Sequence, residues 1–120
     1  YVRYPDPSCR TLRLAIAARY GLDASMVLCG NGASELIFAL CASLRPRRVV
    51  TLAPTFSEYE RAVTLFGGKV LEHNLLESQE FVLTESVLAE LTPDVDMIFL
   101  CNPNNPTGSL AEPSLLCRIA

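Results

Sequence analysis

Apolar and polar positions along the chain follow two patterns, one typical of helices and one of buried strands. From Ala33 onward, apolar residues recur at positions 36, 37, 40, 41 and 44, a spacing that fits one face of a helix. Residues 48–53 and 96–101 form short, mainly apolar runs of the kind found in strands that are buried on both faces. The pattern therefore predicts helices and strands in alternation.

Gly and Pro residues mark the ends of the remaining expected elements. These are a helix from Ser8, its predicted cap, to Gly21; a turn begun by Asp23 that leads into residues 26–29; a helix with apolar positions over 59–66, ended by Gly67 and Gly68; a strand over 69–75; a helix from Thr84 to Pro93; and a helix that opens near Pro113. Such alternation predicts an α/β fold, a three-layer sandwich with a mostly parallel sheet. Because the 120 residues contain no repeat or linker-like block, we expect one domain or part of one.

Ligands of such folds bind beyond the carboxyl ends of the strands, which directs attention to the loops after Cys29, Ala53 and Cys101. The first of these loops is Gly30-Asn31-Gly32-Ala33-Ser34-Glu35, directly before the clearest helix. Glycine permits a tight turn, and the unpaired N–H groups of a helix start favour an anion. The loop is therefore either a phosphate-binding turn or an ordinary strand-to-helix turn. It lacks the third glycine of a dinucleotide-binding fingerprint.

The other two loops carry an aromatic ring and a set of amides. In Ala53-Pro54-Thr55-Phe56-Ser57-Glu58-Tyr59, the ring of Phe56 is either a core side chain or a platform for a planar ligand. The third loop is Asn102-Pro103-Asn104-Asn105-Pro106-Thr107-Gly108. Its prolines make it rigid, its amides can donate to a ligand oxygen, and an Asn–Pro bond permits a cis peptide. A plain Asn/Pro/Gly loop is the alternative.

Composition excludes several classes of protein. Ten Lys and Arg against thirteen Asp and Glu give a net charge of −3, which argues against a nucleic-acid partner. The apolar runs are far shorter than the roughly 20 residues of a membrane-spanning helix. The five cysteines show no C-x-x-C pair and lie mainly in apolar stretches, so we expect buried free thiols, no metal site and a reducing compartment such as the cytoplasm.

Taken in order, the three loops resemble the large, cofactor-binding domain of fold-type I pyridoxal phosphate enzymes, the aminotransferase class I and II superfamily. The resemblance covers the whole chain, residues 1–120. It is strongest to the branch that holds histidinol-phosphate aminotransferases and the threonine-phosphate decarboxylases of cobalamin biosynthesis. Residues 91–110 and Phe56-Ser57-Glu58-Tyr59 look more like the decarboxylases. The resemblance implies a homodimeric enzyme that uses pyridoxal 5'-phosphate on a small phosphorylated amino acid or amine.

The resemblance also implies a role for individual residues. Gly32, Ala33 and Ser34 match the turn that holds the cofactor phosphate, and Phe56 matches the aromatic residue that stacks on the pyridine ring. Asn105 matches the amide that donates to the ring's phenolic oxygen, and its bond to Pro106 is often cis in relatives. Tyr4 matches a tyrosine that reaches the phosphate bound by the partner subunit.

The chain departs from the family pattern in its catalytic groups. Its only lysine, Lys69, does not match the motif of the Schiff-base lysine and is expected at the surface. Asp94 and Asp96 do not match the carboxylate that pairs with the pyridine nitrogen, and His73 is expected to be structural or exposed. We therefore expect no catalytic residue in the chain, whose two ends resemble cuts in a longer protein. A nucleotide-binding Rossmann-like module and a non-catalytic truncated relative are the alternatives.

Overall fold

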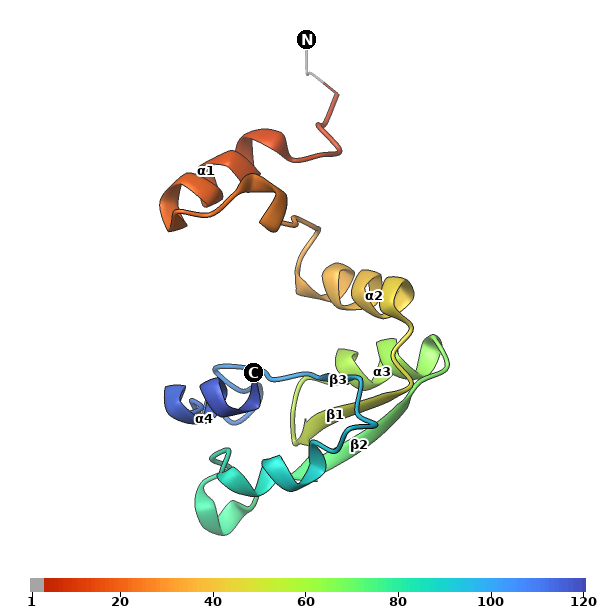
Figure 1. The fold of residues 1–120 in the computed structure, drawn as a ribbon, viewed down its shortest axis with the longest axis vertical. Helices are drawn as coiled ribbons and strands as arrows, with labels where there is room; N and C mark the ends of the chain where they lie inside the picture. Colours follow the sequence, from red (N-terminus) through yellow and green to blue (C-terminus); the bar gives the residue numbers. More distant parts are fainter. Residues whose placement is uncertain (1–3) are drawn as a thin grey trace. The chain divides into compact units, whose positions relative to one another are not determined.

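The computed structural model describes residues 4–120 (Figure 1). They divide after Leu36 into two compact units, an N-terminal unit of helices and loops and a C-terminal unit that holds the sheet.

The sheet consists of three parallel strands in the order β2-β1-β3, so the predicted parallel sheet is confirmed. The central strand β1 covers Arg48–Ala53, and β2 covers Lys69–Asn74. Arg48 pairs with Lys69 at one end of these two strands, and Ala53 pairs with Asn74 at the other. The two predicted strands at 48–53 and 69–75 are thus confirmed to within one residue.

The prediction for residues 96–101 was wrong in extent. Strand β3 covers only Met97–Ile98, and residues 97–101 are half-buried rather than buried. The backbone N–H groups of Asp96 and Phe99 donate to β1, at 2.9 and 3.0 Å from the carbonyl oxygens of Arg48 and Val50. Within residues 4–120 no strand pairs with the other edge of β3, which agrees with its partial exposure.

Helical elements cover both faces of the sheet, as the sandwich prediction required. On one face, Val49 packs with buried residues of α2 (Ala33–Leu44) and α3 (Glu58–Leu65). On the other face, Val50 and Leu52 pack with Val87 of η3 (Glu85–Glu90) and Leu115 of α4 (Pro113–Ile119). Alternate residues of β1 therefore enter two separate cores, as expected for a central strand. The helix predicted from Thr84 is a 3₁₀ helix, because its turns close by i to i+3 bonds such as Val87 N–H to Thr84 O.

The N-terminal unit contains α1 (Arg10–Tyr20) and a 3₁₀ turn, η1 (Ala24–Met26). Gly21 ends α1 in the left-handed conformation, and Asp23 caps η1, both as predicted. The predicted cap Ser8 is wrong. The carboxylate of Asp6 accepts the N–H groups of Ser8 and Arg10 instead, at 2.9 and 2.8 Å.

Residues 27–30 form no strand, so the loop after Cys29 does not follow a strand of this sheet, contrary to expectation. A further 3₁₀ turn, η2 (Glu77–Gln79), follows β2. None of the helices in residues 4–120 has the length and apolar character needed to cross a bilayer.

Candidate functional site

A buried amide joins the loops that follow β1 and β3. The side chain of Asn104 is almost inaccessible, with 4% of the residue exposed. Its Nδ2 donates to the carbonyl oxygen of Pro54 at 3.0 Å and to Oγ1 of Thr107 at 2.9 Å. Its Oδ1 accepts the hydroxyl of Thr55 at 2.8 Å. One side chain thus fixes two loops that lie about fifty residues apart in the sequence.

The third loop also closes on its own backbone. The N–H of Asn104 donates to the carbonyl oxygen of Ser109 at 2.8 Å, and the N–H of Gly108 donates back to that of Asn104 at 2.6 Å. Gly108 has a φ of 73°, a conformation in which a side chain would be strained. The Asn105–Pro106 peptide bond is cis. The closed loop leaves Asn105 exposed, and no hydrogen bond joins its side chain to another residue in the described part of the chain.

Phe56 belongs to a row of three aromatic rings in which Tyr59 contacts the other two. Its ring meets Tyr59 edge-on, with centroids 5.7 Å apart and planes at 86°. Tyr59 in turn stacks on Phe99, at 4.7 Å and 11°. Burial raises the pKa of Tyr59 to about 12, and the neighbouring thiol of Cys101 adds to the effect. Phe56 is half-buried, so the other rings fix its position while part of its own surface stays accessible.

A hollow of about 270 Å³ opens at the carboxyl end of β1. Its walls combine the end of β1, the loop after it, the start of α3, one residue of β2 and one residue of the third loop: Thr51, Leu52, Ala53, Pro54, Thr55, Phe56, Ser57, Glu60, Glu72 and Pro106. Phe56 and Pro106, the neighbour of Asn105, therefore line the same space. This is the place where the second and third loops were expected to present a ligand-binding surface.

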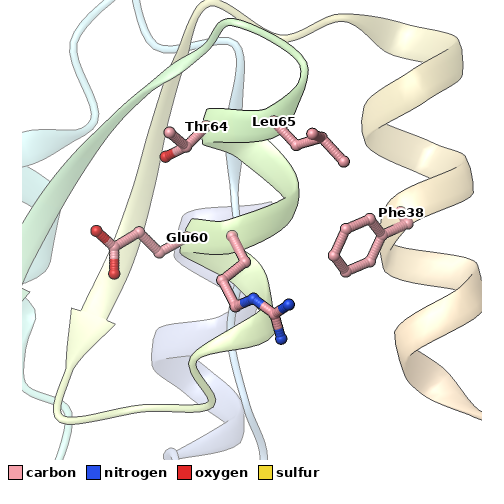
Figure 2. A pocket seen from close by; sticks show the side chains of 5 residues that line it. Phe38, Glu60, Thr64 and Leu65 are labelled. Carbon is pink, nitrogen blue, oxygen red and sulfur yellow. The ribbon is translucent and has the colours of Figure 1, made fainter.

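A larger hollow, of about 430 Å³, lies beside α2 and α3 (Figure 2). Phe38 of α2 faces it from one side, and Glu60, Arg61, Thr64 and Leu65 of α3 line the other. All of its lining residues come from helices, so it is not the region where the loops at the end of the sheet meet.

The first loop belongs to the N-terminal unit. Gly32 has a φ of 87°, and its N–H donates to the carbonyl oxygen of Gly30 at 2.9 Å. Ala33 and Ser34 are the first two residues of α2, where N–H groups have no acceptor within the helix. The carboxylate of Glu35 accepts the N–H of Asn31. The loop thus has the tight turn and the free helix start that an anion requires.

The structure also describes three other positions that the sequence analysis singled out. Tyr4 is 97% exposed. Lys69 is exposed at the amino end of β2, the end of the sheet opposite to Phe56. His73 has a structural environment, because its Nε2 lies 3.2 Å from the hydroxyl of Ser86 and its Nδ1 lies 3.8 Å from the carboxylate of Glu90.

The five cysteines are free thiols, as predicted, but only Cys41 is buried and Cys117 is exposed. The expectation of general burial was therefore wrong. Residues 4–120 contain no group of three or more His, Cys, Asp or Glu side chains arranged to hold a metal ion.

A comparison with protein families matches residues 1–120 to the model of aminotransferase class I and II. The chain belongs to the aminotransferase class I and II family. Membership of this family argues against the alternative of a nucleotide-binding Rossmann-like module. It agrees with the absence of a strand before Gly30 in the described residues, since a dinucleotide-binding turn follows a strand.

Two relatives in this family are similar over nearly the whole chain. The threonine-phosphate decarboxylase of Salmonella typhimurium is 44% identical over 118 residues, which are 98% of this chain and 32% of the relative. The histidinol-phosphate aminotransferase of Desulfitobacterium hafniense is 43% identical over 124 residues, with 98% of this chain and 34% of the relative covered. The crystal structure of L-threonine-O-3-phosphate decarboxylase from Porphyromonas gingivalis matches with a TM-score of 0.82 and 28% identity, over 98% of this chain and 34% of that one. The chain thus spans about a third of the length of the relatives it matches.

Enzymes of the aminotransferase class I and II family depend on pyridoxal phosphate, and the described residues fit that cofactor. A partly accessible ring, Phe56, suits a planar heteroaromatic group, and the outward amide of Asn105 suits a ring oxygen. Asn104 and Tyr59, the residues that hold these two groups in place, were not predicted from the sequence. The spacing of Tyr59, one helical turn after Phe56, was an available signal for the contact between the two rings.

Proposed function

We propose that this chain forms the cofactor-binding part of a pyridoxal-phosphate enzyme that acts on a phosphorylated amino acid, and that the enzyme is a threonine-phosphate decarboxylase. The supporting observation is that Phe56 and the loop of Asn105 meet at one hollow in a chain that is 44% identical to such a decarboxylase. The small, phosphate-bearing substrates named for both relatives give the substrate class.

In this proposal the ring side chains orient the cofactor. Phe56 would hold the pyridine ring by stacking, and Tyr59 and Phe99 keep Phe56 from turning away. Asn105 would donate a hydrogen bond to the phenolic oxygen, while Asn104 holds the loop that carries it. When bound, pyridoxal phosphate supplies an electron sink for the bond that breaks at the substrate's α-carbon. Which bond breaks depends on how the substrate is held, and this determines whether the enzyme is a decarboxylase or an aminotransferase.

The phosphate of the cofactor is assigned to the first loop. Gly32, Ala33 and Ser34 offer backbone N–H groups at the start of α2, and Ser34 adds a hydroxyl donor. Tyr4 is assigned to the phosphate bound by a second copy of the chain, so the enzyme is proposed to be a homodimer. Free thiols fit a reducing compartment, and we assign the enzyme to the cytoplasm.

None of the 120 residues is proposed as the catalytic amine. Lys69 lies at the amino end of β2, whereas Phe56 and Asn105 follow the carboxyl ends of β1 and β3. The Schiff-base lysine is therefore assigned to the two-thirds of the family's length that this chain does not span.

The second candidate is a histidinol-phosphate aminotransferase, favoured by the 43% identity to such an enzyme. The test is an assay of the full-length protein with pyridoxal phosphate and each substrate. Release of carbon dioxide from threonine phosphate supports the decarboxylase. Transfer of the amino group of histidinol phosphate to a 2-oxo acid supports the aminotransferase. A full-length protein that shows neither reaction and no absorbance change on adding pyridoxal phosphate would overturn both and leave the non-catalytic relative.

A further inference from the structure

A third hollow, of about 630 Å³, opens at the end of the sheet opposite to the cofactor loops. Its lining consists of Arg47, Arg48, Gly67, Lys69 and Leu71. Three of the ten cationic side chains of the whole sequence therefore line one space. Such a concentration stands out in a chain whose net charge is −3.

The backbone fixes these three cations beside one another. Arg48 and Lys69 are paired in register at the first position of two neighbouring parallel strands. The N–H of Lys69 donates to the carbonyl oxygen of Arg47 at 2.8 Å. The turn before Lys69 packs tightly, because a Cβ at Gly68 would overlap the carbonyl oxygen of Pro46. The hollow is thus built on ordered strand ends rather than on a loose surface loop.

Nearby carboxylates balance only part of this charge. Arg48 forms an ion pair with Asp94. Asp96 accepts the backbone N–H groups of Arg47 and Arg48, at 2.7 and 2.9 Å, and its carboxylate also attracts the charge of Arg47 without forming an ion pair with it. Neither the guanidinium of Arg47 nor the ammonium of Lys69 has a carboxylate partner among residues 4–120. The ammonium of Lys69, and the guanidinium of Arg47 that Asp96 balances only from a distance, therefore remain available to a ligand.

We propose that this hollow is a second binding site, for a small anion that carries phosphate groups. A guanidinium binds phosphate oxygens in pairs, and an ammonium beside it adds a point charge. Asp94, paired with Arg48, and Asp96, bound to the backbone of Arg47 and Arg48, lie next to these cations and would repel an extended polyanion such as a nucleic acid, so a compact ligand is favoured. The site lies at the amino ends of the strands and does not depend on the proposed cofactor site at their carboxyl ends.

The test is calorimetric titration of inorganic pyrophosphate into the full-length protein, after loading with pyridoxal phosphate and removal of the excess by gel filtration. We expect saturable binding that weakens as salt is raised. The double variant R47Q/K69Q should lose at least tenfold in affinity, and the matched control R61Q/R118Q, which removes the same charge elsewhere, should change it less than twofold. Circular dichroism checks that both variants fold.

Two results would overturn the proposal. Absence of saturable binding in the wild-type protein would mean that another segment of the full-length protein covers the hollow or that it is simply solvated. An equal loss in both double variants would mean that pyrophosphate responds only to net charge. Because the readout is heat of binding rather than activity, failure of the proposed enzyme function would leave this result unchanged.

Discussion

Replacing Asn104 by alanine should disconnect the two loops that carry Phe56 and Asn105. The Asn104 side chain makes three hydrogen bonds, to Pro54, Thr55 and Thr107, and all three groups are left without this partner in the variant. No hydrophobic gain compensates, because the removed group is a buried amide.

The expected loss of stability follows from these contacts. Each intramolecular hydrogen bond contributes about 0.5–1.5 kcal/mol net, so three give roughly 1.5–4.5 kcal/mol. We expect a value in the upper half of that range, because the carbonyl oxygen of Pro54 and the hydroxyl of Thr107 are left in partly buried surroundings. Such a change is a large fraction of the total stability of a typical domain.

The assay is urea unfolding of the full-length protein, followed by a spectral titration with pyridoxal phosphate. Asn105→Ala is the matched control, because the same side chain is removed one position away, at an exposed site. Asn104→Ala should lower both stability and cofactor affinity. Asn105→Ala should change stability by less than about 0.5 kcal/mol and lower only the affinity, by about tenfold. Equal stability losses, or an Asn104→Ala variant as stable as the wild type, would refute the reasoning.

Three further predictions test the scaffold around the site. Because the pKa of Tyr59 is raised, its stabilising contribution is complete below about pH 10 and is lost as pH rises through about 12. The urea midpoint of Tyr59→Phe should therefore fall less steeply with pH in that window than the midpoint of the wild type. Equal slopes would contradict the burial argument. Two backbone N–H groups lower the pKa of Asp96, so its contribution to stability is present above about pH 4 and is lost as pH falls further. At acid pH the stability of Asp96→Asn should therefore change less with pH than that of the wild type. Superimposable profiles would count against this prediction. Gly68→Ala should lower the stability of the protein by about 1–3 kcal/mol in urea unfolding, because its Cβ would lie 2.7 Å from Cγ1 of Val63. Gly21→Ala is the control, because its Cβ would have open space and the variant tests the conformational strain alone.

The central strand of the sheet was predictable from the sequence. The apolar run 48–53 has the composition of a strand covered on both faces, and its alternate residues do enter two cores. The run 96–101 has the same composition, but only Met97 and Ile98 form a ladder. Composition reports the tendency of a segment to be buried, whereas a ladder also needs a partner strand that stays in register along its length, and that depends on residues far away in the sequence.

The third loop shows a second limit. Two adjacent residues of identical type, Asn104 and Asn105, have opposite roles, since one is buried and bonded and the other is exposed. Their difference arises from Pro54 and Thr55, about fifty positions earlier, which accept and donate to Asn104. A local pattern cannot specify such a long-range pairing, so the sequence predicted the loop as a candidate site but not the contacts that support it.

The two ends of the sheet have different chemistry for a reason that lies in its parallel order. All strands of a parallel sheet begin at the same end of the sheet, so their first residues lie together there. This places Arg48 beside Lys69, with Asp96 just before β3. The loops that follow the strands, here those of Phe56 and Asn105, lie at the opposite end. Neutral amides and an aromatic ring suit the orientation of a planar cofactor, whereas cations on strand ends suit a compact anion. A substitution at one end of the sheet should therefore leave binding at the other end unchanged. A change in cofactor affinity in R47Q/K69Q would show that the sheet does not separate the two proposed sites.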